Sequence, residues 1–491
     1  MSSSGTAEIR QAFDLRLHIR DLTIAVPPTL SAITTYVLLE QEEWFEKEIH
    51  FLRRFLKRGM TAIDIGANLG VYSLPMARLV GPGGRVFSYE PGVEARTLLE
   101  RSRALNDFRN LEIIGAALSD GEREGSLAFA ASSELRALST AETGEPVRIT
   151  SLDLESAVRG WPSIDFIKID AEGEEERIVE GGHGLLTAQS PLVMFEVKAG
   201  AAVNERLRAL LPAIGYRLFR QLEGEPILVP QDASQTLDGS ELNLFAAKPD
   251  RVSALSKQGL LVDAIPPWVP GNEDRKRADS FWRRQRFASS KGAFGGIRMS
   301  EDLEYQNSLA AYATWRAPDR PLATRCAALA FASQSLRAIC ARACTVERAS
   351  TWARAAWEWG ARQESIAALQ QVLQRLQGAR VPLVEPFWPA RPRFDDIVPK
   401  AGAAEWFAVA AAEQYERIWS FSSFFSGGSP VLAWLCRQSF AGAEMERRRM
   451  LIDARAGLRP EVPKRLRAVA PDHRNAEIWR SGAVPGTMVA P

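Results

Sequence analysis

The sequence predicts an α/β fold with a mostly parallel sheet over residues 60–248, followed by a region built from helices. Two observations predict the α/β part: short apolar runs typical of strands alternate with helical patterns, and acidic residues stand at the ends of several of these runs. Such alternation is typical of parallel strands joined by crossover helices. Sheets of this kind bind ligands beyond the carboxyl ends of their strands. A third observation predicts the helical part: after about residue 250 the chain becomes rich in Ala, Arg, Leu and Glu, with few strand signals.

Residues 1–58 are expected to form a lead-in that packs on the α/β domain. Apolar and polar side chains alternate within 14–40, which indicates a strand or hairpin, and a Pro-Pro pair ends it. Residues 42–58 carry apolar side chains at helical spacing, with Glu early and Lys or Arg late, and therefore predict a helix whose charges suit its dipole. Gly59 provides the helix stop.

The α/β domain is assigned to residues 59–250. Its strands are predicted at 61–65, 85–89, 111–116, 126–130, 147–150, 164–169, 192–197, 217–220, 227–229 and 243–247. Its helices are predicted at 71–80, 93–105, 151–159, 175–187 and 203–213. This order places crossover helices between the early strands.

Residues 251–299 are predicted to be a linker, because they contain a Pro- and Gly-rich stretch at 265–271. Residues 300–491 are predicted to be an all-helical domain. Within it, 357–373 resembles one helix–turn–helix junction of a tetratricopeptide repeat, but an array needs about three copies and only one good copy is found. A degenerate repeat and a plain helical bundle both stay open. This domain could bind a protein partner, dimerise the chain or cap a substrate cleft.

The turn after the first strand of the α/β domain is the strongest functional signal. Residues 64–70 have the sequence Asp-Ile-Gly-Ala-Asn-Leu-Gly and link a strand to a helix. Glycine lets the backbone approach a ligand closely, and the helix start directs N–H groups at it. Glu90, at the end of the next apolar run, could bind two vicinal ribose hydroxyls. Together they predict a nucleoside-binding pocket, although an ordinary tight turn would show similar glycines.

Two cofactors compete for this pocket. A dinucleotide fold requires G-x-G-x-x-G, whereas here the third glycine is missing and Asp64 opens the turn. A carboxylate at this place would repel a pyrophosphate but attract an α-ammonium group. The sequence therefore favours S-adenosyl-L-methionine, which has an amino-acid tail and a ribose, over NAD and an oxidoreductase.

A second acidic cluster follows the predicted strand 164–169. Lys168 and Asp170 point to the same side of this strand, and a lysine inside a covered sheet needs a partner. Asp170 and Glu172 reach the same sheet edge as the glycine turn, and Glu196 closes the next strand there. The three carboxylates could hold a divalent cation, orient polyol hydroxyls or act as general base toward a hydroxyl. No metal site is assigned among them.

Composition argues against several classes of protein. A net charge of +1 provides no electrostatic basis for binding nucleic acid or an anionic membrane. No stretch approaches the roughly 20 apolar residues of a membrane span, and the N-terminus has no secretion signal. The four cysteines are expected to be free thiols in a reducing compartment, so a cytoplasmic location is predicted.

Taken together, the motifs resemble the FkbM family of S-adenosylmethionine-dependent methyltransferases. The resemblance extends over residues 20–248. It rests on motifs in the family's order and spacing, at 64–73, 89–91, 106, 116–120, 151–153, 168–175 and 195–197. The resemblance implies a Rossmann-like class I methyltransferase fold with a mostly parallel seven-stranded sheet. It implies nothing about residues 250–491.

The resemblance also implies O-methylation of a hydroxyl, on a sugar, a glycan or a polyketide-like natural product. The residues implied for the methionine side of the cofactor are Asp64, Gly66, Asn68 and Gly70, and those implied for its ribose and adenine are Glu90 and Ala117. The catalytic residues implied at the transferred methyl are Lys168, Asp170 and Glu172, and Glu196 is assigned to the substrate. A non-catalytic adaptor that works through its helical domain is the alternative outside enzymes. The intact acidic set argues against it.

Overall fold

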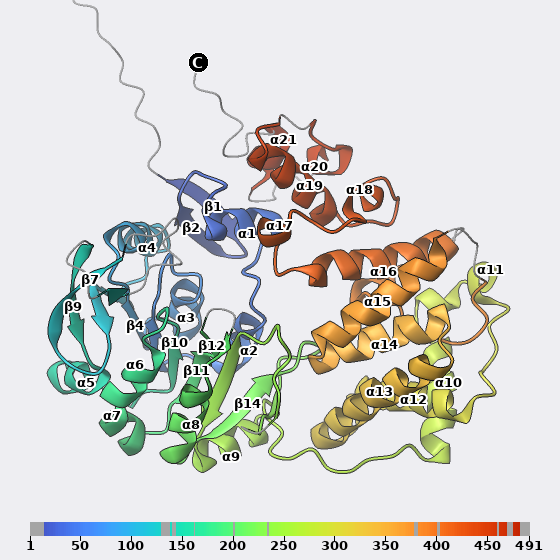
Figure 1. Cartoon of the computed structure of the whole chain (residues 1–491), viewed down its shortest axis with the longest axis horizontal. Coiled ribbons are helices and arrows are strands. Elements are labelled where there is room, and N and C mark those ends of the chain that lie inside the picture. Colours follow the sequence, from blue (N-terminus) through green and yellow to red (C-terminus); the bar gives the residue numbers. More distant parts are fainter. Residues whose placement is uncertain are drawn as a thin grey trace, which may run out of the picture.

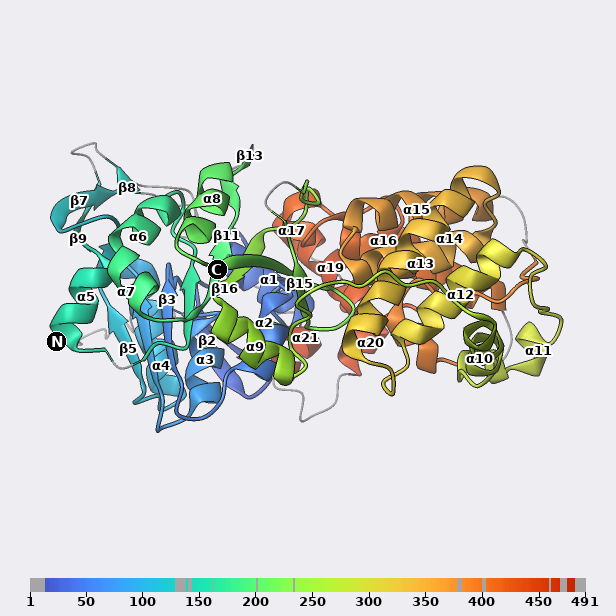
Figure 2. The same cartoon turned by 90° about the horizontal axis from the view of Figure 1, so that it is seen from below.

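An α/β part and a helical part lie side by side in the computed structural model, and the last helices fold back over the N-terminal strands (Figures 1 and 2). The structure describes residues 14–128, 138–139, 144–161, 163–199, 202–232, 235–377, 382–399, 403–458, 461–468 and 475–481. The predicted strand end at 129–130 lies outside these residues. Within the described ranges, no helix has both the length and the apolar character that crossing a membrane requires.

The centre of the α/β part is an eight-stranded sheet in the order β15-β14-β16-β11-β10-β3-β4-β5. Its strands are β3 (Thr61–Ile65), β4 (Arg85–Tyr89), β5 (Leu111–Ile114), β10 (Phe166–Ile169), β11 (Leu192–Glu196), β14 (Arg217–Gln221), β15 (Leu228–Pro230) and β16 (Asn243–Ala247). The five strands from β5 to β11 are parallel, whereas β16, β14 and β15 join by antiparallel pairing. The prediction of a mostly parallel sheet is confirmed, with eight strands instead of seven because β15 pairs at the edge.

Helices cover both faces of this sheet. One face packs on helices α2 (Glu48–Phe55), α3 (Ser73–Val80), α4 (Val93–Leu105) and α9 (Pro249–Lys257). The other face packs on α5 (Leu152–Arg159), α6 (Glu175–Gly181), α7 (His183–Ala188) and α8 (Glu205–Ala213). Every side chain of β3 and β10 is buried, as expected for parallel strands covered on both faces.

Several predicted elements differ from the observed ones. The run 111–116 divides at Gly115, where a Cβ atom would lie 2.9 Å from the Arg96 guanidinium carbon. The chain then enters a second sheet, of order β6-β9-β7-β8, made of β6 (Ala116–Leu118), β7 (Arg123–Leu127), β8 (Leu138–Ser139) and β9 (Glu145–Thr150). The strand expected at 126–130 begins at Arg123, because β7 pairs with β9 along its whole length. The helix expected at 175–187 is broken after Gly181, next to a second glycine, where helix propensity is low.

The N-terminal lead-in consists of a hairpin and two helices. The hairpin strands are β1 (Leu15–Ile19) and β2 (Leu22–Val26), and the first helix is α1 (Ile33–Gln41). Helix α1 was not predicted, because residues 33–40 are buried on all sides and lack the alternation of a polar face. The helix expected over 42–58 begins only at Glu48. Glu42 adopts a left-handed φ of 58°, and residues 44–46 leave the helical path to line the cavity described below.

The helical part continues from α10 to α16. Its helices are α10 (Asn272–Arg283), α11 (Lys291–Phe294), α12 (Leu303–Trp315), α13 (Leu322–Arg342), α14 (Val346–Trp359), α15 (Arg362–Leu376) and α16 (Ala403–Trp419). From α12 onward each packs on the next, around an aromatic core that includes Trp282, Phe287, Trp388 and Trp406. Helix α10 lies within the segment predicted as a linker and packs on α12.

The last helices return to the N-terminal part. They are α17 (Ser423–Ser426), α18 (Leu432–Leu435), α19 (Ala443–Arg455), α20 (Lys464–Arg467) and α21 (Ala476–Ser481), and Figure 1 shows them near β1, β2 and α1. Leu451 and Trp479 belong to the same apolar core as Leu17 and Tyr36. The region 300–491 therefore contributes to two separate cores.

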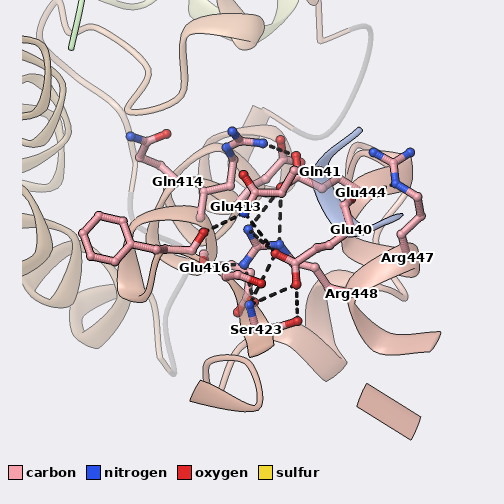
Figure 3. Close-up of polar contacts among 12 residues, drawn as sticks. Glu40, Gln41, Glu413, Gln414, Glu416, Ser423, Glu444, Arg447 and Arg448 are labelled. Carbon is pink, nitrogen blue, oxygen red and sulfur yellow. Dashed lines mark hydrogen bonds and ion pairs between the residues drawn. The ribbon is translucent and has the colours of Figure 1, made fainter. Parts of the chain in front are cut away.

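A buried arginine joins the returning segment to α1. Arg448 on α19 lies 3.2 Å from carboxylate oxygens of Glu40, Glu416 and Glu444, and its side chain is 2% exposed (Figure 3). Ser423 donates its backbone N–H to Glu40 at 3.0 Å. Helices α1, α16, α17 and α19 therefore meet at one charged cluster.

Arg448→Ala is expected to lower the free energy of unfolding by about 3–5 kcal/mol, because Glu40 and Glu416 would stay buried without a positive partner. Urea unfolding followed by tryptophan fluorescence measures the loss. Arg449→Ala is the matched control, since its half-exposed pair with Asp453 is expected to contribute less than about 1 kcal/mol. Equal losses in the two variants would contradict the importance of the buried cluster.

Candidate active site

A cavity of about 280 Å³ opens at the carboxyl ends of β3, β4, β10 and β11. Nine of the ten residues predicted for the site line it, namely Asp64, Gly66, Asn68, Glu90, Ala117, Lys168, Asp170, Glu172 and Glu196. The exception is Gly70. A Cβ atom there would lie 2.3 Å from Leu99 Cδ1, so this glycine lets the turn pack on α4.

The glycine turn depends on a close approach between two strand ends. Gly66 has a φ of +75°, and a Cβ atom there would lie 1.7 Å from the carbonyl oxygen of Asp170. Only glycine fits this position without displacing the backbone. Asn68 also adopts a left-handed φ, of 45°, which asparagine tolerates better than most residues. The turn therefore brings its backbone directly beside the second acidic cluster.

Asp64 is fully buried and keeps one carboxylate oxygen unsatisfied. Ser73 Oγ donates to Asp64 Oδ2 at 2.5 Å, while Lys168 Nζ lies 4.0 Å from Oδ1. Among the described residues, none donates a hydrogen bond to Oδ1. Burial raises the pKa of Asp64, against the opposing effect of Lys168. A buried acceptor without a hydrogen-bond donor can accept a hydrogen bond from a ligand's ammonium group. Asp64 Oδ1 is therefore compatible with the amino-acid tail of the cofactor.

Glu90 is held in place by the backbone. Its two carboxylate oxygens accept hydrogen bonds from the N–H groups of Asn68 (2.8 Å) and Gly92 (2.7 Å). Each oxygen retains a second lone pair for another donor, such as a ligand hydroxyl. Burial raises the pKa of Glu90 to about 7. The carboxylate is therefore fixed before a ligand arrives, at the tip of the strand next to the glycine turn.

Lys168 is the only buried cation among the residues that line this cavity. Its Nζ lies 2.7 Å from Asp170 Oδ2 and 5.1 Å from the centre of the Tyr72 ring. Burial opposes its charge, but Asp170 and then Asp64 keep its pKa above the ordinary value. The lysine therefore stays charged and fixes the Asp170 side chain at the cavity.

The remaining acidic residues crowd one wall. Burial raises the pKa of Glu196 to about 9, and Asp170 and Glu172 add to the increase. Glu172 adopts a left-handed φ of 50°, which costs a non-glycine residue on the order of 1–3 kcal/mol and is typical of functional sites. Within the part of the chain that the structure describes, no group of three His, Cys, Asp or Glu side chains has the arrangement of a metal site.

Sequence analysis missed several residues that line the cavity, among them Phe45, Glu46, Tyr72 and Phe425. Glu46 accepts hydrogen bonds from Tyr72 Oη at 2.6 Å and Asn243 Nδ2 at 3.1 Å, and burial raises its pKa. Phe45 and Phe425 lie edge-on to each other with their centres 6.4 Å apart. Glu46, Phe45 and Tyr72 lie in or beside segments taken as helix. No sequence pattern connects Phe425, far along the chain, to this site.

The sequence of this site matches a known family. Residues 64–218 match the family model of the methyltransferase FkbM domain. This segment is an FkbM methyltransferase domain. Membership confirms the predicted family and S-adenosylmethionine as the cofactor, and it agrees with the predicted Rossmann-like sheet. No curated protein matches the chain in sequence.

Several solved structures share low similarity with this chain. The methyltransferase FkbM from Methylobacillus flagellatus KT has 12% identity and a TM-score of 0.28, over 44% of this chain and 58% of that one. A SAM-dependent O-methyltransferase from Thermotoga maritima has 16% identity and a TM-score of 0.27, over 48% and 86%. A SAM-dependent methyltransferase from Aquifex aeolicus has 15% identity and a TM-score of 0.26, over 43% and 92%.

Glu196→Gln is expected to stabilise the protein increasingly as the pH rises. The folded pKa of about 9 lies above the ordinary 4.5, so the stability contributed by the protonated side chain is complete below pH 4.5 and is lost toward pH 9. Glutamine stays neutral and avoids this loss. The melting temperature of the variant relative to wild type should rise by about 2 °C or more between pH 5 and pH 9.

The matched control for this pH series is Glu100→Gln on the exposed face of α4. Its melting temperature relative to wild type should stay constant across the same pH range. A constant difference for Glu196→Gln as well would show that Glu196 titrates as an ordinary surface carboxyl.

Proposed function

We propose that this FkbM protein transfers a methyl group from S-adenosylmethionine to a hydroxyl of a sugar or glycan. The observation that carries the proposal is one cavity that combines two sets of groups. A cofactor half contains the unsatisfied Asp64 Oδ1 and the fixed Glu90 carboxylate. A reaction half contains the Lys168–Asp170 ion pair and a wall of carboxyl groups.

In this proposal the cofactor lies along the ends of β3 and β4. Asp64 binds the α-ammonium group, and the backbone at Gly66 and Asn68 lies against the methionine tail. Glu90 accepts hydrogen bonds from the two ribose hydroxyls, and Ala117, which also lines the cavity, contacts the adenine. Gly70 contributes only by letting the turn pack closely.

S-adenosylmethionine supplies an electrophilic methyl carbon when it is bound. The protein must then hold the acceptor oxygen in line and accept its proton. Asp170 is the proposed proton acceptor, because its carboxylate lies at the cavity and is oriented by Lys168 at 2.7 Å. Glu172 is proposed to assist it from the same loop. Glu196, whose pKa is raised to about 9, carries a proton near neutral pH and can donate a hydrogen bond to the acceptor.

The lining of the reaction half supports a polyol acceptor over an apolar natural product. Phe45 and Tyr72 offer ring faces and edges, on which the C–H face of a sugar can pack. Glu46 and Glu196 offer polar groups on the same wall, which can bind hydroxyl groups. A polyketide-like acceptor would offer Glu196 few hydrogen-bonding groups.

Glu90→Ala is expected to weaken S-adenosylmethionine binding at least about tenfold, because it removes a charged acceptor from the ribose hydroxyls. Isothermal titration calorimetry measures the dissociation constant. Glu100→Ala, on the exposed side of helix α4 that follows Glu90 in the chain, is the control and should bind as wild type does. Unchanged binding by Glu90→Ala, or thermal stabilisation of wild type by NAD and not by S-adenosylmethionine, would contradict the proposed pocket.

Asp170→Asn is expected to lower the rate of methyl transfer by about 10²–10⁴-fold, because the amide cannot accept the hydroxyl proton. Transfer of a labelled methyl group to a carbohydrate extract of the producing cells measures the rate. The dissociation constant of S-adenosylmethionine should change little, since Asp170 is assigned to the acceptor. If Asp170→Asn instead binds S-adenosylmethionine poorly but keeps its turnover at saturating cofactor, Asp170 belongs to the cofactor half and its proposed role is wrong.

A further inference from the structure

A second cavity, of about 110 Å³, lies between the α/β part and the helical part. It shares Phe45, Glu46 and Leu242 with the first cavity, so the two are separated by no more than these side chains. Its far wall comes from the helical part, through residues on or near α14, α15 and α16. A molecule bound at the Lys168–Asp170 pair could therefore reach the helical part through this second cavity.

Arg362 is one of three arginines on the far wall. Its Nε donates to the carbonyl oxygen of Ile418 at 2.8 Å, and its guanidinium lies 4.1 Å from the centre of the Phe421 ring. Among the described residues it forms no ion pair with a carboxylate, and Glu223 and Asp238 act on it only through their charge. Burial lowers the pKa of Arg362. The side chain is thus held rigidly at the cavity while its charge has no direct counter-ion.

Arg391 is poorly paired for a different reason. Its Nε lies 3.3 Å from Glu413 Oε1, but Arg393 takes both oxygens of that carboxylate at 2.5 Å. Burial and then the positive charge of Arg417 lower the pKa of Arg391 to about 9. Arg417 itself is paired with Glu444. Two arginines at this cavity therefore lack a carboxylate of their own.

Gln414 adds an unsatisfied donor to the same wall. Its side chain is completely buried and lines the second cavity. Arg391 Nη1 donates to its Oε1 at 3.4 Å, whereas its Nε2 has no partner among the described residues. Figure 3 shows the Gln414 amide turned away from the cluster around Arg448. A buried amide N–H without an acceptor points to a ligand oxygen at this place.

The acidic residues of the second cavity make their close contacts with other groups. Glu46 accepts hydrogen bonds from Tyr72 and Asn243. Glu223 and Glu241 pair with Lys47, at 3.4 Å and 2.8 Å. Burial raises the pKa of Glu48 well above its ordinary value, which disfavours a negative charge on this side chain. The two arginines without a carboxylate of their own and the Gln414 amide therefore lie together in a volume that would hold only about three or four water molecules.

We propose that the second cavity binds an oxyanion group of the methyl acceptor, a phosphate or a carboxylate, through Arg362, Arg391 and the Gln414 amide. This inference rests on the proposed function and refines its substrate class to an anionic sugar derivative. The guanidinium groups and the amide N–H supply donors for a compact oxyanion, and the cavity is too small for a sugar ring. Phe45, Glu46 and Leu242 then lie beside the middle of the acceptor, whose hydroxyl end reaches Asp170.

The test uses the full chain and measures its melting temperature in sodium phosphate, sodium acetate and sodium chloride at equal ionic strength. Phosphate, acetate or both should raise the melting temperature above the chloride value in a saturable manner. A response to phosphate alone assigns a phosphorylated acceptor, and a response that includes acetate assigns a carboxylate. Arg391→Gln should weaken the apparent affinity for the active anion at least tenfold, and Arg437→Gln, an exposed arginine of the helical part, should not change it.

The folding of Arg391→Gln is checked by its own melting temperature in chloride, which should not fall, because the arginine it replaces is poorly paired. Arg362→Gln provides a second, independent variant with the same expected loss of anion binding. Equal melting temperatures of wild type in all three salts, or undiminished anion binding by both variants, would overturn the proposal. Binding of S-adenosylmethionine to wild type is measured in parallel. An absence of binding would contradict the proposed function and would leave the anion result unaffected.

Discussion

The burial of one guanidinium group constrains the whole chain. Arg448 has carboxylates from α1, α16 and α19 around it, and a buried charge is tolerated only when such partners are all in place. This requirement brings the end of the helical part against the N-terminal helix. Through Ser423, which binds Glu40, it also sets the position of α17 and therefore of Phe425 at the first cavity. Both cavities thus depend on contacts made far from the sheet.

The sheet edge supplies the second constraint. Parallel strands end at one edge, so the side chains that follow them meet there whatever their separation in sequence. Gly66 then allows the turn after β3 to touch the backbone of Asp170, which brings the proposed cofactor half and the proposed reaction half within one cavity. Lys168 lies between these halves, with Asp64 on one side and Asp170 on the other. A single buried cation therefore contacts a carboxylate in each of the two halves.

The parts of the site that sequence reasoning found are those that follow from this edge rule. Asp64, Glu90 and Glu196 each come at a strand end, and the structure brings all three to one cavity. Glu46 was missed because its segment carries apolar residues at helical spacing, although Tyr72 and Asn243 hold it at the cavity. The antiparallel pairing of β16 with β11 and β14, and of β14 with β15, was equally invisible, because strand direction depends on the connecting path and leaves no mark in the strand itself.

By itself the sequence determined the alternation of strands and helices, the glycine turn and the acidic residues at the strand ends. These features are local, since turn geometry and side-chain alternation depend on neighbouring residues. The motifs also predicted the family whose model residues 64–218 match. Only the tertiary structure decided that α17 to α21 return to α1, that Phe425 reaches the first cavity, and that Arg362 and Arg391 meet Phe45 and Glu46 around a second one. Such contacts join residues hundreds of positions apart, and they are set by packing and by the pairing of buried charges, which no local pattern encodes.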